Sequence, residues 1–462
     1  MRPDTGSQAK SYPTTEATRG QAPPATAEDP PNKRGMFASL RVRNYRLFFS
    51  GQVISNIGTW MQRIAQDWLV FQLSGNNPIA LGIAVALQFV PTLALSLWAG
   101  VLADRVDKRK LGIVIQSGMG LQALVLGLLD VSGAVALWQV YLLCFVLGIF
   151  SALDVPTRQA FVAEMVGRKQ IPNAVALNSS VFNMARIVGP AIAGFAITWV
   201  GTGWMFLANA VSTLAVITGL ALMNPDKLFR GPAVVRAKGQ LRDGLAYVRG
   251  RADLMTVMVL VFFVSTFGIT FFTSLAIVAG NVFGTQADGY GMLSTLLAVG
   301  TFTGSLLAAR RGAKGRPRVR LLLAAAFGLG AVEFVASFMP TYLAFGIALI
   351  PLGFATITFL NTANSLVQTA VSAEMRGRVM GIYVLVLIGG NPIGGPMVGW
   401  MASTFGGRSP FYIGGAISVL AAVACAAVLA RRGVATGYRP AGLRVLFSSG
   451  RVGAVSHAKQ VR

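Results

Sequence analysis

The sequence predicts an all-α polytopic membrane protein, with twelve transmembrane helices in two parallel six-helix halves around a central cavity. Three observations support this fold class. The 462-residue chain is 54% hydrophobic and only 12% charged, about half the charged fraction of a typical soluble protein. Its apolar residues form a series of stretches of about 20 residues. Sequence landmarks of its first half also recur in its second half.

The apolar stretches between Tyr45 and Ala430 are each long enough to cross a bilayer as a helix. We expect spans at 45–71, 79–103, 111–130, 137–157, 174–200, 204–223, 254–279, 288–309, 320–338, 341–367, 378–402 and 409–430. The more polar segments complete the organisation, because they cannot form an apolar core. We expect a disordered cytoplasmic tail at 1–37, an N-terminal half at 38–223, a cytoplasmic connector at 224–253, a C-terminal half at 254–430 and a basic cytoplasmic tail at 431–462.

The basic residues are distributed asymmetrically. Lys and Arg number 40 against 16 Asp and Glu, which gives a formal net charge of +24. With the N-terminus inside, 37 of the 40 fall in cytoplasmic segments, Arg408 lies in an outer loop, and Arg63 and Arg186 lie within spans. This is the positive-inside pattern, so we expect both termini to be cytoplasmic. The basic excess therefore indicates contact with membrane lipids and not with nucleic acid.

Three landmarks indicate an internal duplication. Ala163-Glu164-Met165 recurs as Ala373-Glu374-Met375, and the basic loop after Gly100 recurs after Gly304. The third landmark is Gly189-Pro190 with Gly194, which recurs as Gly395-Pro396 with Gly399. Parallel repeats of this kind place a small-molecule substrate site between the two halves, near the bilayer midplane.

Several kinds of chemistry are disfavoured by composition. His457 is the one histidine, which argues against a histidine-ligated metal site and against Ser-His-Asp catalysis. Cys144 and Cys425 both lie in apolar runs and give no disulfide framework. The sequence has no Gly-x4-Gly-Lys-Ser/Thr loop, so an ATP-driven process is unsupported. We therefore expect a transporter with no cofactor, not an enzyme, that uses an ion gradient or the substrate's own gradient.

Two segments resemble signatures of the major facilitator superfamily. Residues 100–110 read Gly100-Val-Leu-Ala-Asp104-Arg105-Val-Asp107-Lys108-Arg109-Lys110, which resembles the superfamily's inner-loop signature, with Asp107 where that signature has a second glycine. Residues 186–194, which contain Gly189-Pro190, are similar to the signature of its exporters. The stretch from Asp154 to Asn178, together with Trp60 to Trp68, resembles the branch that includes the enterobactin and macrolide exporters.

The resemblance implies a monomeric secondary transporter of the bacterial inner membrane. It would export amphipathic small molecules, such as drugs, siderophores or secondary metabolites, by proton-coupled alternating access. An importer or uniporter of the same fold is the alternative. A membrane enzyme or lipid-handling protein is less favoured, because it would need clustered His, Asp and Glu residues that this sequence lacks. The resemblance also implies an inner gate, with Arg158 as the partner of Asp104; its residues would be Gly100, Asp104, Arg105, Arg109 and Arg158.

Ionisable residues inside spans cost about 2.5–3.5 kcal/mol to insert, so they are functional candidates. Arg63 and Asp67 are four residues apart on one helical face, as are Asp154 and Arg158. We assign proton coupling to Asp154 and Asp67, with Arg63 as the switchable partner of Asp67. Asp154 ranks first because Asp67 is expected near the outer boundary, where Arg63 and Asp67 could instead be a self-neutralising pair. Glu333 has no charged neighbour in its span, so it could either titrate under a proton gradient or have a protonated, hydrogen-bonded structural role; we do not assign the coupling to it.

Other span residues suit a substrate cavity or flexible helices. Gln66, Phe267, Phe271, Asn361 and Asn364 are the cavity candidates, because aromatic rings and amides suit an amphipathic ligand. Proline removes a backbone hydrogen bond from a helix, so the repeated Gly-Pro elements predict helices that bend during transport. These candidates are Gly189, Pro190, Gly194, Gly395, Pro396 and Gly399.

Overall fold

The computed structural model describes residues 35, 37–229, 240–312 and 319–435. This part of the chain is helical and contains no β-strand. Eleven helical stretches within it are long and apolar enough to cross a membrane. The expected tails at 1–37 and 431–462 lie almost entirely outside the described residues.

Residues up to 227 form a first group of helices, in which the expected spans appear with shifted ends. The helix α4 continues nine residues past the expected end at 157, into the segment that follows Arg158. The bounds are η1 (Ala38–Arg41), α1 (Arg43–Leu73), α2 (Pro78–Arg105), α3 (Lys108–Val131), α4 (Leu137–Val166), η2 (Arg168–Gln170), α5 (Ile171–Val200), α6 (Thr202–Ala221) and η3 (Pro225–Lys227).

The helix α1 is not among the eleven apolar stretches, although its 31 residues are sufficient to cross a bilayer. The reason is its polar content, because it buries Gln52, Gln62, Gln66 and Asp67 within the protein. Gln62 accepts a hydrogen bond of 2.6 Å from Asn209 of α6 and donates one of 3.0 Å to Gln122 of α3. Polar side chains of α1 thus bind neighbouring helices within the first helix group.

A second group of helices follows, and two of its membrane-crossing stretches are interrupted. The stretch 252–282 consists of α8 and α9 with a π-helical segment after each, and the stretch 374–405 breaks at Gly390 between α13 and α14. The bounds are α8 (Ala252–Phe263), η4 (Val264–Gly268), α9 (Phe271–Ile277), η5 (Val278–Val282), α10 (Ala287–Gly312), α11 (Val319–Ala336), α12 (Tyr342–Ala370), α13 (Ala373–Gly389), α14 (Asn391–Phe405) and α15 (Ser409–Ala435).

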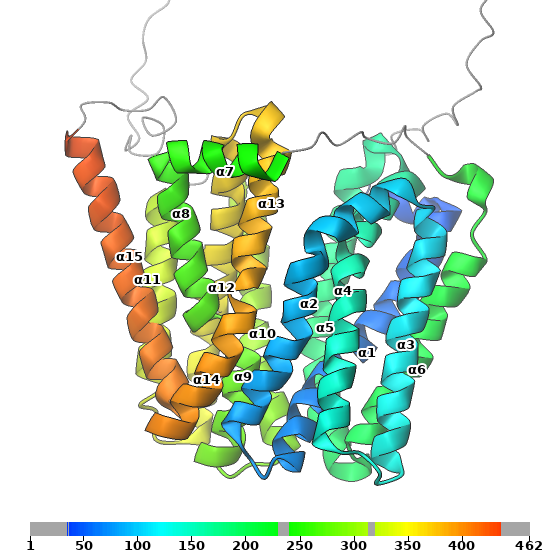
Figure 1. Cartoon of the computed structure of the whole chain (residues 1–462), viewed down its shortest axis with the longest axis horizontal. Coiled ribbons are helices and arrows are strands. Elements are labelled where there is room, and N and C mark those ends of the chain that lie inside the picture. Colours follow the sequence, from blue (N-terminus) through cyan, green and yellow to red (C-terminus); the bar gives the residue numbers. More distant parts are fainter. Residues whose placement is uncertain (1–34, 36, 230–239, 313–318, 436–462) are drawn as a thin grey trace, which may run out of the picture.

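The expected connector contains a helix that was not predicted from the sequence. Helix α7 (Gln240–Gly250) lies across one end of the second helix group (Figure 1). Asp243 of α7 pairs with Arg378 of α13 at 3.0 Å, which holds α7 against that group. Arg251 follows α7 and binds Asp253, whose carboxylate raises the pKa of the Arg251 guanidinium.

The two helix groups lie side by side, in contact toward one end and apart at the other (Figure 1). Two helix crossings join them, α2 with α14 and α5 with α10. Glycines make both crossings possible. A Cβ atom on Gly194 of α5 would lie 2.8 Å from the Cα of Gly291 in α10, and one on Gly82 of α2 would lie 2.8 Å from the Cα of Pro396 in α14.

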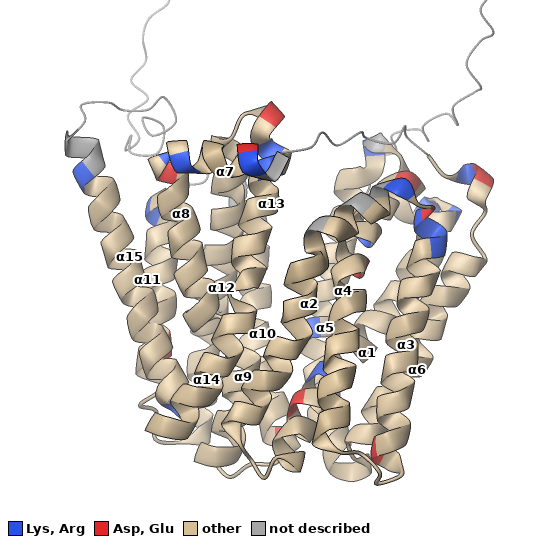
Figure 2. Cartoon of the chain, in the orientation of Figure 1, with Lys and Arg blue, Asp and Glu red and all other residues tan. Residues whose placement is uncertain are grey.

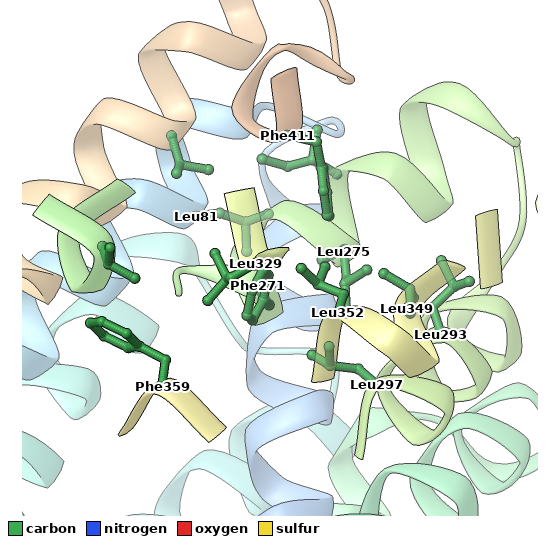
Figure 3. Packing of buried hydrophobic residues seen from close by; sticks show 14 of the residues in the cluster. Leu81, Phe271, Leu275, Leu293, Leu297, Leu329, Leu349, Leu352, Phe359 and Phe411 are labelled. Carbon is green, nitrogen blue, oxygen red and sulfur yellow. The ribbon is translucent and has the colours of Figure 1, made fainter. Parts of the chain in front are cut away.

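One apolar core runs through the second helix group and extends into the first, where it includes Leu81 of α2. Phe271, Leu275, Leu329, Leu352 and Phe411 are all within this core and at most 2% exposed (Figure 3). Phe271, which was expected to line the substrate cavity, is buried within this core. Its neighbour Phe272 lies against the first helix group, with its ring centre 5.8 Å from the Arg63 guanidinium.

Surface residues agree with a membrane setting. Figure 2 shows Lys and Arg gathered at the end of the molecule where α7 lies and where α2 joins α3. Large apolar side chains are exposed along the helices, as expected for a surface in contact with lipid. Tryptophans near several helix ends are more than half exposed, as is typical of the membrane interface; they are Trp98, Trp138, Trp199, Trp204 and Trp400.

Candidate functional site

Asp67 joins the two helix groups. Its Oδ2 atom accepts a hydrogen bond of 3.2 Å from Nε of Arg63, one turn earlier on α1, as the spacing of the two residues predicts. The same oxygen accepts a hydrogen bond of 3.0 Å from the hydroxyl of Tyr290 on α10. Asp67 is 2% exposed and Tyr290 is fully buried. The structure therefore places a buried carboxylate between the groups, closed off from solvent although it is near the end of α1.

Two arginines and three aromatic rings form a cluster that Arg63 links to this carboxylate. The Arg63 guanidinium lies 5.9 Å from the ring centre of Phe89 and 5.8 Å from that of Phe272. The Arg186 guanidinium lies 5.7 Å from the ring centre of Trp60 and 5.8 Å from that of Phe272. Phe272 belongs to the second helix group and the others belong to the first. We call Trp60, Arg63, Phe89, Arg186 and Phe272 the arginine–aromatic cluster.

The proposed cavity residues do not form one site. Gln66 is buried and donates a hydrogen bond of 3.3 Å to Gln88 of α2. Phe267 stacks on Phe263, with ring centres 6.2 Å apart. Asn361 is exposed, and Asn364 accepts a hydrogen bond from Gln368 on the same helix. Phe272, one residue after Phe271, reaches the first helix group, as Tyr290 does.

Asp154 is enclosed within the first helix group. Its Oδ2 lies 3.6 Å from the Arg158 guanidinium, and its Oδ1 accepts a hydrogen bond of 3.1 Å from Gln116 of α3. Arg158 also donates a hydrogen bond to Gln52 of α1. A small pocket beside them is lined by residues of α1, α3, α4 and α6, all from the first group. The printed partners of Asp154, Gln116 of α3 and Arg158 of α4, both belong to the first group.

The structure describes part of the expected inner gate. The side chain of Asp104, and with it the expected pairing with Arg158, lies outside the described residues. Arg109 donates hydrogen bonds of 2.6 and 2.7 Å to the carbonyls of Leu220 and Ala221, at the end of α6. A cation at this position stabilises the C-terminal end of a helix. Arg109 therefore ties α3 to α6 within one group.

Two further contacts in this region were not predicted from the sequence. Lys108 pairs with Glu164 of α4 at 2.7 Å, and Glu164 belongs to the repeated Ala-Glu-Met triplet. Asp107, which replaces the usual glycine, accepts hydrogen bonds from the backbone N–H groups of Arg109 and Lys110 and so caps α3. The repeat of Glu164 as Glu374 was the available signal for the first contact. No spacing within α2 or α3 could indicate a partner on α4.

Glu333 occupies a niche in the second helix group. It is 3% exposed, and its Oε2 atom has no hydrogen-bond partner among the described residues. Gly268 of η4 and Gly414 of α15 leave room for its carboxyl group, since a Cβ atom at Gly414 would lie 3.2 Å from Oε1. Its surroundings belong to α11, η4 and α15, so Glu333 is remote from the Asp67 contact between groups.

The Gly-Pro elements lie where helices approach closely. A Cβ on Gly189 would lie 3.1 Å from the carbonyl oxygen of Ile57 and closer still to Trp60. A Cβ on Gly395 would lie 2.8 Å from Val85, and one on Gly399 would lie 2.6 Å from the carbonyl oxygen of Pro78. Helix α5 continues through Pro190 and α14 through Pro396. Close packing is thus their visible role.

The whole folded part of the chain matches one known family. A model of the transmembrane secretion effector family, within the major facilitator superfamily, matches residues 34–437. The chain belongs to this family. The resemblance inferred from residues 100–110 and 186–194 is therefore confirmed.

Curated relatives are bacterial transporters. The chain is 26% identical to the staphyloferrin A transporter of Staphylococcus aureus, over 78% of this chain and 90% of that protein. It is 22% identical to the enterobactin exporter EntS of Shigella flexneri, over 78% and 85% of the two chains. It is 21% identical to macrolide efflux protein A of Streptococcus pyogenes, over 83% and 96%.

Solved structures with low sequence identity share the fold. A POT family transporter in complex with 5-aminolevulinic acid aligns with a TM-score of 0.67 and 12% identity, over 85% of this chain and 97% of that one. A bacterial homologue of the human lysosomal transporter Spinster, in an inward-facing conformation, aligns with a TM-score of 0.62 and 15% identity, over 86% and 99%. The chain is therefore an integral membrane transporter and not an enzyme.

Proposed function

We propose that this transporter exports amphipathic small molecules in exchange for protons by alternating access, and that Asp67 is the proton-coupling residue. The contact that carries the proposal is the hydrogen bond from Tyr290 to Asp67, because it links a buried ionisable group to the opposite helix group. The names of relatives that export enterobactin or macrolides favour export over import or uniport.

The proposed architecture is twelve membrane-spanning helices in two six-helix halves. Helix α1 would be the twelfth span, beside the eleven apolar stretches of the described residues. The crossings between the groups support a duplication. By their position in the repeat, α2 corresponds to α10 and α5 to α14, so that α2 with α14 and α5 with α10 are equivalent crossings. The proposed halves span 38–223 and 254–430, joined by the connector 224–253.

The proposed orientation places both termini in the cytoplasm of a bacterial inner membrane. The basic residues gathered at the α7 end support it, because basic loops are retained on the cytoplasmic side. The helix groups diverge at that end and meet at the other (Figure 1). We infer that this arrangement is the inward-facing state. We also propose that the transporter is a monomer and that its basic end contacts anionic lipids.

Asp67 couples the proton to this movement in three steps. In the inward-facing state, the Asp67 carboxylate binds Arg63 and accepts the Tyr290 hydrogen bond, which helps to close the outer side. Opening the outer side moves α10 away from α1, so Tyr290 leaves and Asp67 meets the external solution. A proton taken up there neutralises Asp67 and weakens its pairing with Arg63. On return to the inward-facing state, Arg63 and the Tyr290 hydroxyl bind the Asp67 carboxylate again and displace its proton, which leaves through the cytoplasmic opening between the helix groups.

Asp154 and the inner loop have a separate role in this proposal. Asp154 and Arg158 neutralise each other inside the first group, and Lys108 with Glu164 ties α3 to α4 nearby. We infer that Gly100, Asp104, Arg105, Arg109 and Arg158 form the inner gate, which closes when the groups meet at this end. Bending of α5 and α14 at their Gly-Pro elements would accompany that closure.

Everted membrane vesicles provide the test. An imposed pH gradient should drive accumulation of substrate by the wild-type protein, and Asp67→Asn should abolish that accumulation while substrate exchange without a gradient persists. Asp130→Asn is the matched control, because Asp130 is bonded to Thr202 within the first group. Normal pH-driven accumulation by Asp67→Asn would exclude Asp67 as the coupling residue. If substrate accumulated in right-side-out vesicles and not in everted vesicles, an importer would be favoured.

A further inference from the structure

Arg186 is an intramembrane cation with no counterion among the described residues. It lies midway along α5, and no acidic side chain pairs with it in the part of the chain that the structure describes. Its Nε atom is buried without a hydrogen-bond partner in the same region. Arg63 and Arg158, which also lie within membrane helices of the first group, differ because Arg63 binds Asp67 and Arg158 binds Asp154. A buried donor without an acceptor is costly, and a charged one more so.

Aromatic rings offset only part of this cost. Trp60 and Phe272 attract the Arg186 charge through their faces, at 5.7 and 5.8 Å. Phe182, one turn before Arg186 on α5, packs edge-on against Trp60 with ring centres 5.6 Å apart. A ring face does not replace an oxygen acceptor, and a guanidinium carries five N–H donors in a planar fork. The described residues thus hold Arg186 in place but leave its buried Nε donor without an acceptor.

The charges of the arginine–aromatic cluster do not cancel. Arg63 and Arg186 both face the ring of Phe272, and Asp67 is the one acidic residue that contacts either of them among the described residues. One positive charge therefore remains between the helix groups. It lies between apolar walls from both groups, where a negative group carried by a ligand would gain most from it.

We propose that Arg186 binds a carboxylate of the exported molecule, and that Trp60, Phe182 and Phe272 pack against the molecule's apolar or aromatic part. This inference rests on the proposed export function and specifies its substrate class: amphipathic organic anions. A planar guanidinium matches a carboxylate with two parallel hydrogen bonds, and the rings fix its orientation beforehand. The same positive charge repels cations, so amphipathic amines are poor ligands of this site.

Equilibrium binding separates this inference from export itself. The full-length protein in nanodiscs is titrated with 1-pyrenebutyrate, its uncharged amide and a trimethylammonium analogue, and bound probe is followed by fluorescence anisotropy. Wild-type protein should bind the carboxylate at least about tenfold more tightly than the amide, and the cation most weakly. Arg186→Met should bring carboxylate and amide to equal affinity. Arg186→Lys should retain a reduced preference, because an ammonium keeps the charge but loses the fork.

A matched control removes another arginine that contacts an aromatic ring. Arg408 faces the ring of Phe283 but also donates hydrogen bonds to the carbonyls of Ser337 and Met339, so its donors are in use. Arg408→Gln should keep the wild-type preference for the carboxylate. If Arg186→Met does not fold, the wild-type preference and its reduction in Arg186→Lys carry the test.

The outcomes distinguish the two proposals. Equal binding of the carboxylate and the amide by wild-type protein, or an undiminished preference in Arg186→Met, would overturn the anion site. Failure of wild-type protein to bind the carboxylate at millimolar concentration would overturn it as well. Failure of pH-driven export in vesicles, with the binding preference intact, would instead overturn the proposed export function and leave the anion site standing.

Discussion

Tyr290 of α10 donates a hydrogen bond of 3.0 Å to Asp67 of α1, and so connects the two helix groups through a buried carboxylate. The indole of Trp68, the next residue, stacks on the Tyr290 ring with centres 6.3 Å apart. The hydroxyl and the ring of Tyr290 therefore make separate contacts with α1. A substitution that removes only the hydroxyl can isolate the polar contact.

Tyr290→Phe should weaken the closed outer side while preserving the ring contact with Trp68. Hydrogen bonds within membranes contribute about 1 kcal/mol, so we expect the free energy of unfolding of the purified protein to fall by about that amount. A double-mutant cycle with Asp67→Asn provides the check. The cost of Tyr290→Phe should shrink in the Asp67→Asn background, because the carboxylate acceptor is then absent. Equal costs in both backgrounds would mean that the contact contributes nothing to closure.

Most of the membrane helices were predictable, because a bilayer requires apolar stretches of nearly fixed length. The interruptions were not. The π-helical segment Val264–Gly268 and the break at Gly390 lie inside continuous apolar runs. Helix α7 was not predicted because its residues are too polar for a membrane span. Its position against the second helix group depends on the ion pair between Asp243 and Arg378 of α13, which is distant in sequence.

The candidate site was predictable only where its contacts lie within one helix. The spacing of Arg63 and Asp67, and of Asp154 and Arg158, indicated ion pairs that the structure contains. Tyr290 lies 223 residues after Asp67, and no local pattern connects them. Which face of this stretch Phe271 and Phe272 occupy could not be read from a regular helical period, because the π-helical segment Val264–Gly268 precedes them.

The proposed orientation can be tested at two exposed positions on opposite ends of the molecule. Arg249→Cys places a thiol on α7, and Ser132→Cys places one in the turn after α3. In whole cells, a membrane-impermeant maleimide should label Ser132→Cys and leave Arg249→Cys unlabelled until the membrane is permeabilised. The native Cys144 and Cys425 are buried and should give little background. The reverse labelling pattern would invert the topology.

The ion pair between Lys108 and Glu164 should hold α3 to α4 at the inner gate. Lys108→Glu should reduce transport, because two carboxylates would then face each other at the 2.7 Å contact. Adding Glu164→Lys should restore much of the lost rate by re-forming the pair with its charges exchanged. Transport is measured as initial rates in vesicles at matched protein levels. A double variant no better than Lys108→Glu would show that the position of each charge matters, and not their pairing.

Gly194→Leu should block the inward-facing state. Even a Cβ atom at this position would lie 2.8 Å from the Cα of Gly291, so the larger side chain forces α5 away from α10 at the outer side. We expect normal membrane insertion, loss of transport by tenfold or more as an order-of-magnitude estimate, and increased labelling of Asp67→Cys from outside in the Gly194→Leu background. Gly328→Leu is the control, because a Cβ at Gly328 meets nothing within 4 Å among the described residues. It should transport normally. If Gly194→Leu also transports normally, the crossing of α5 and α10 does not close the outer side.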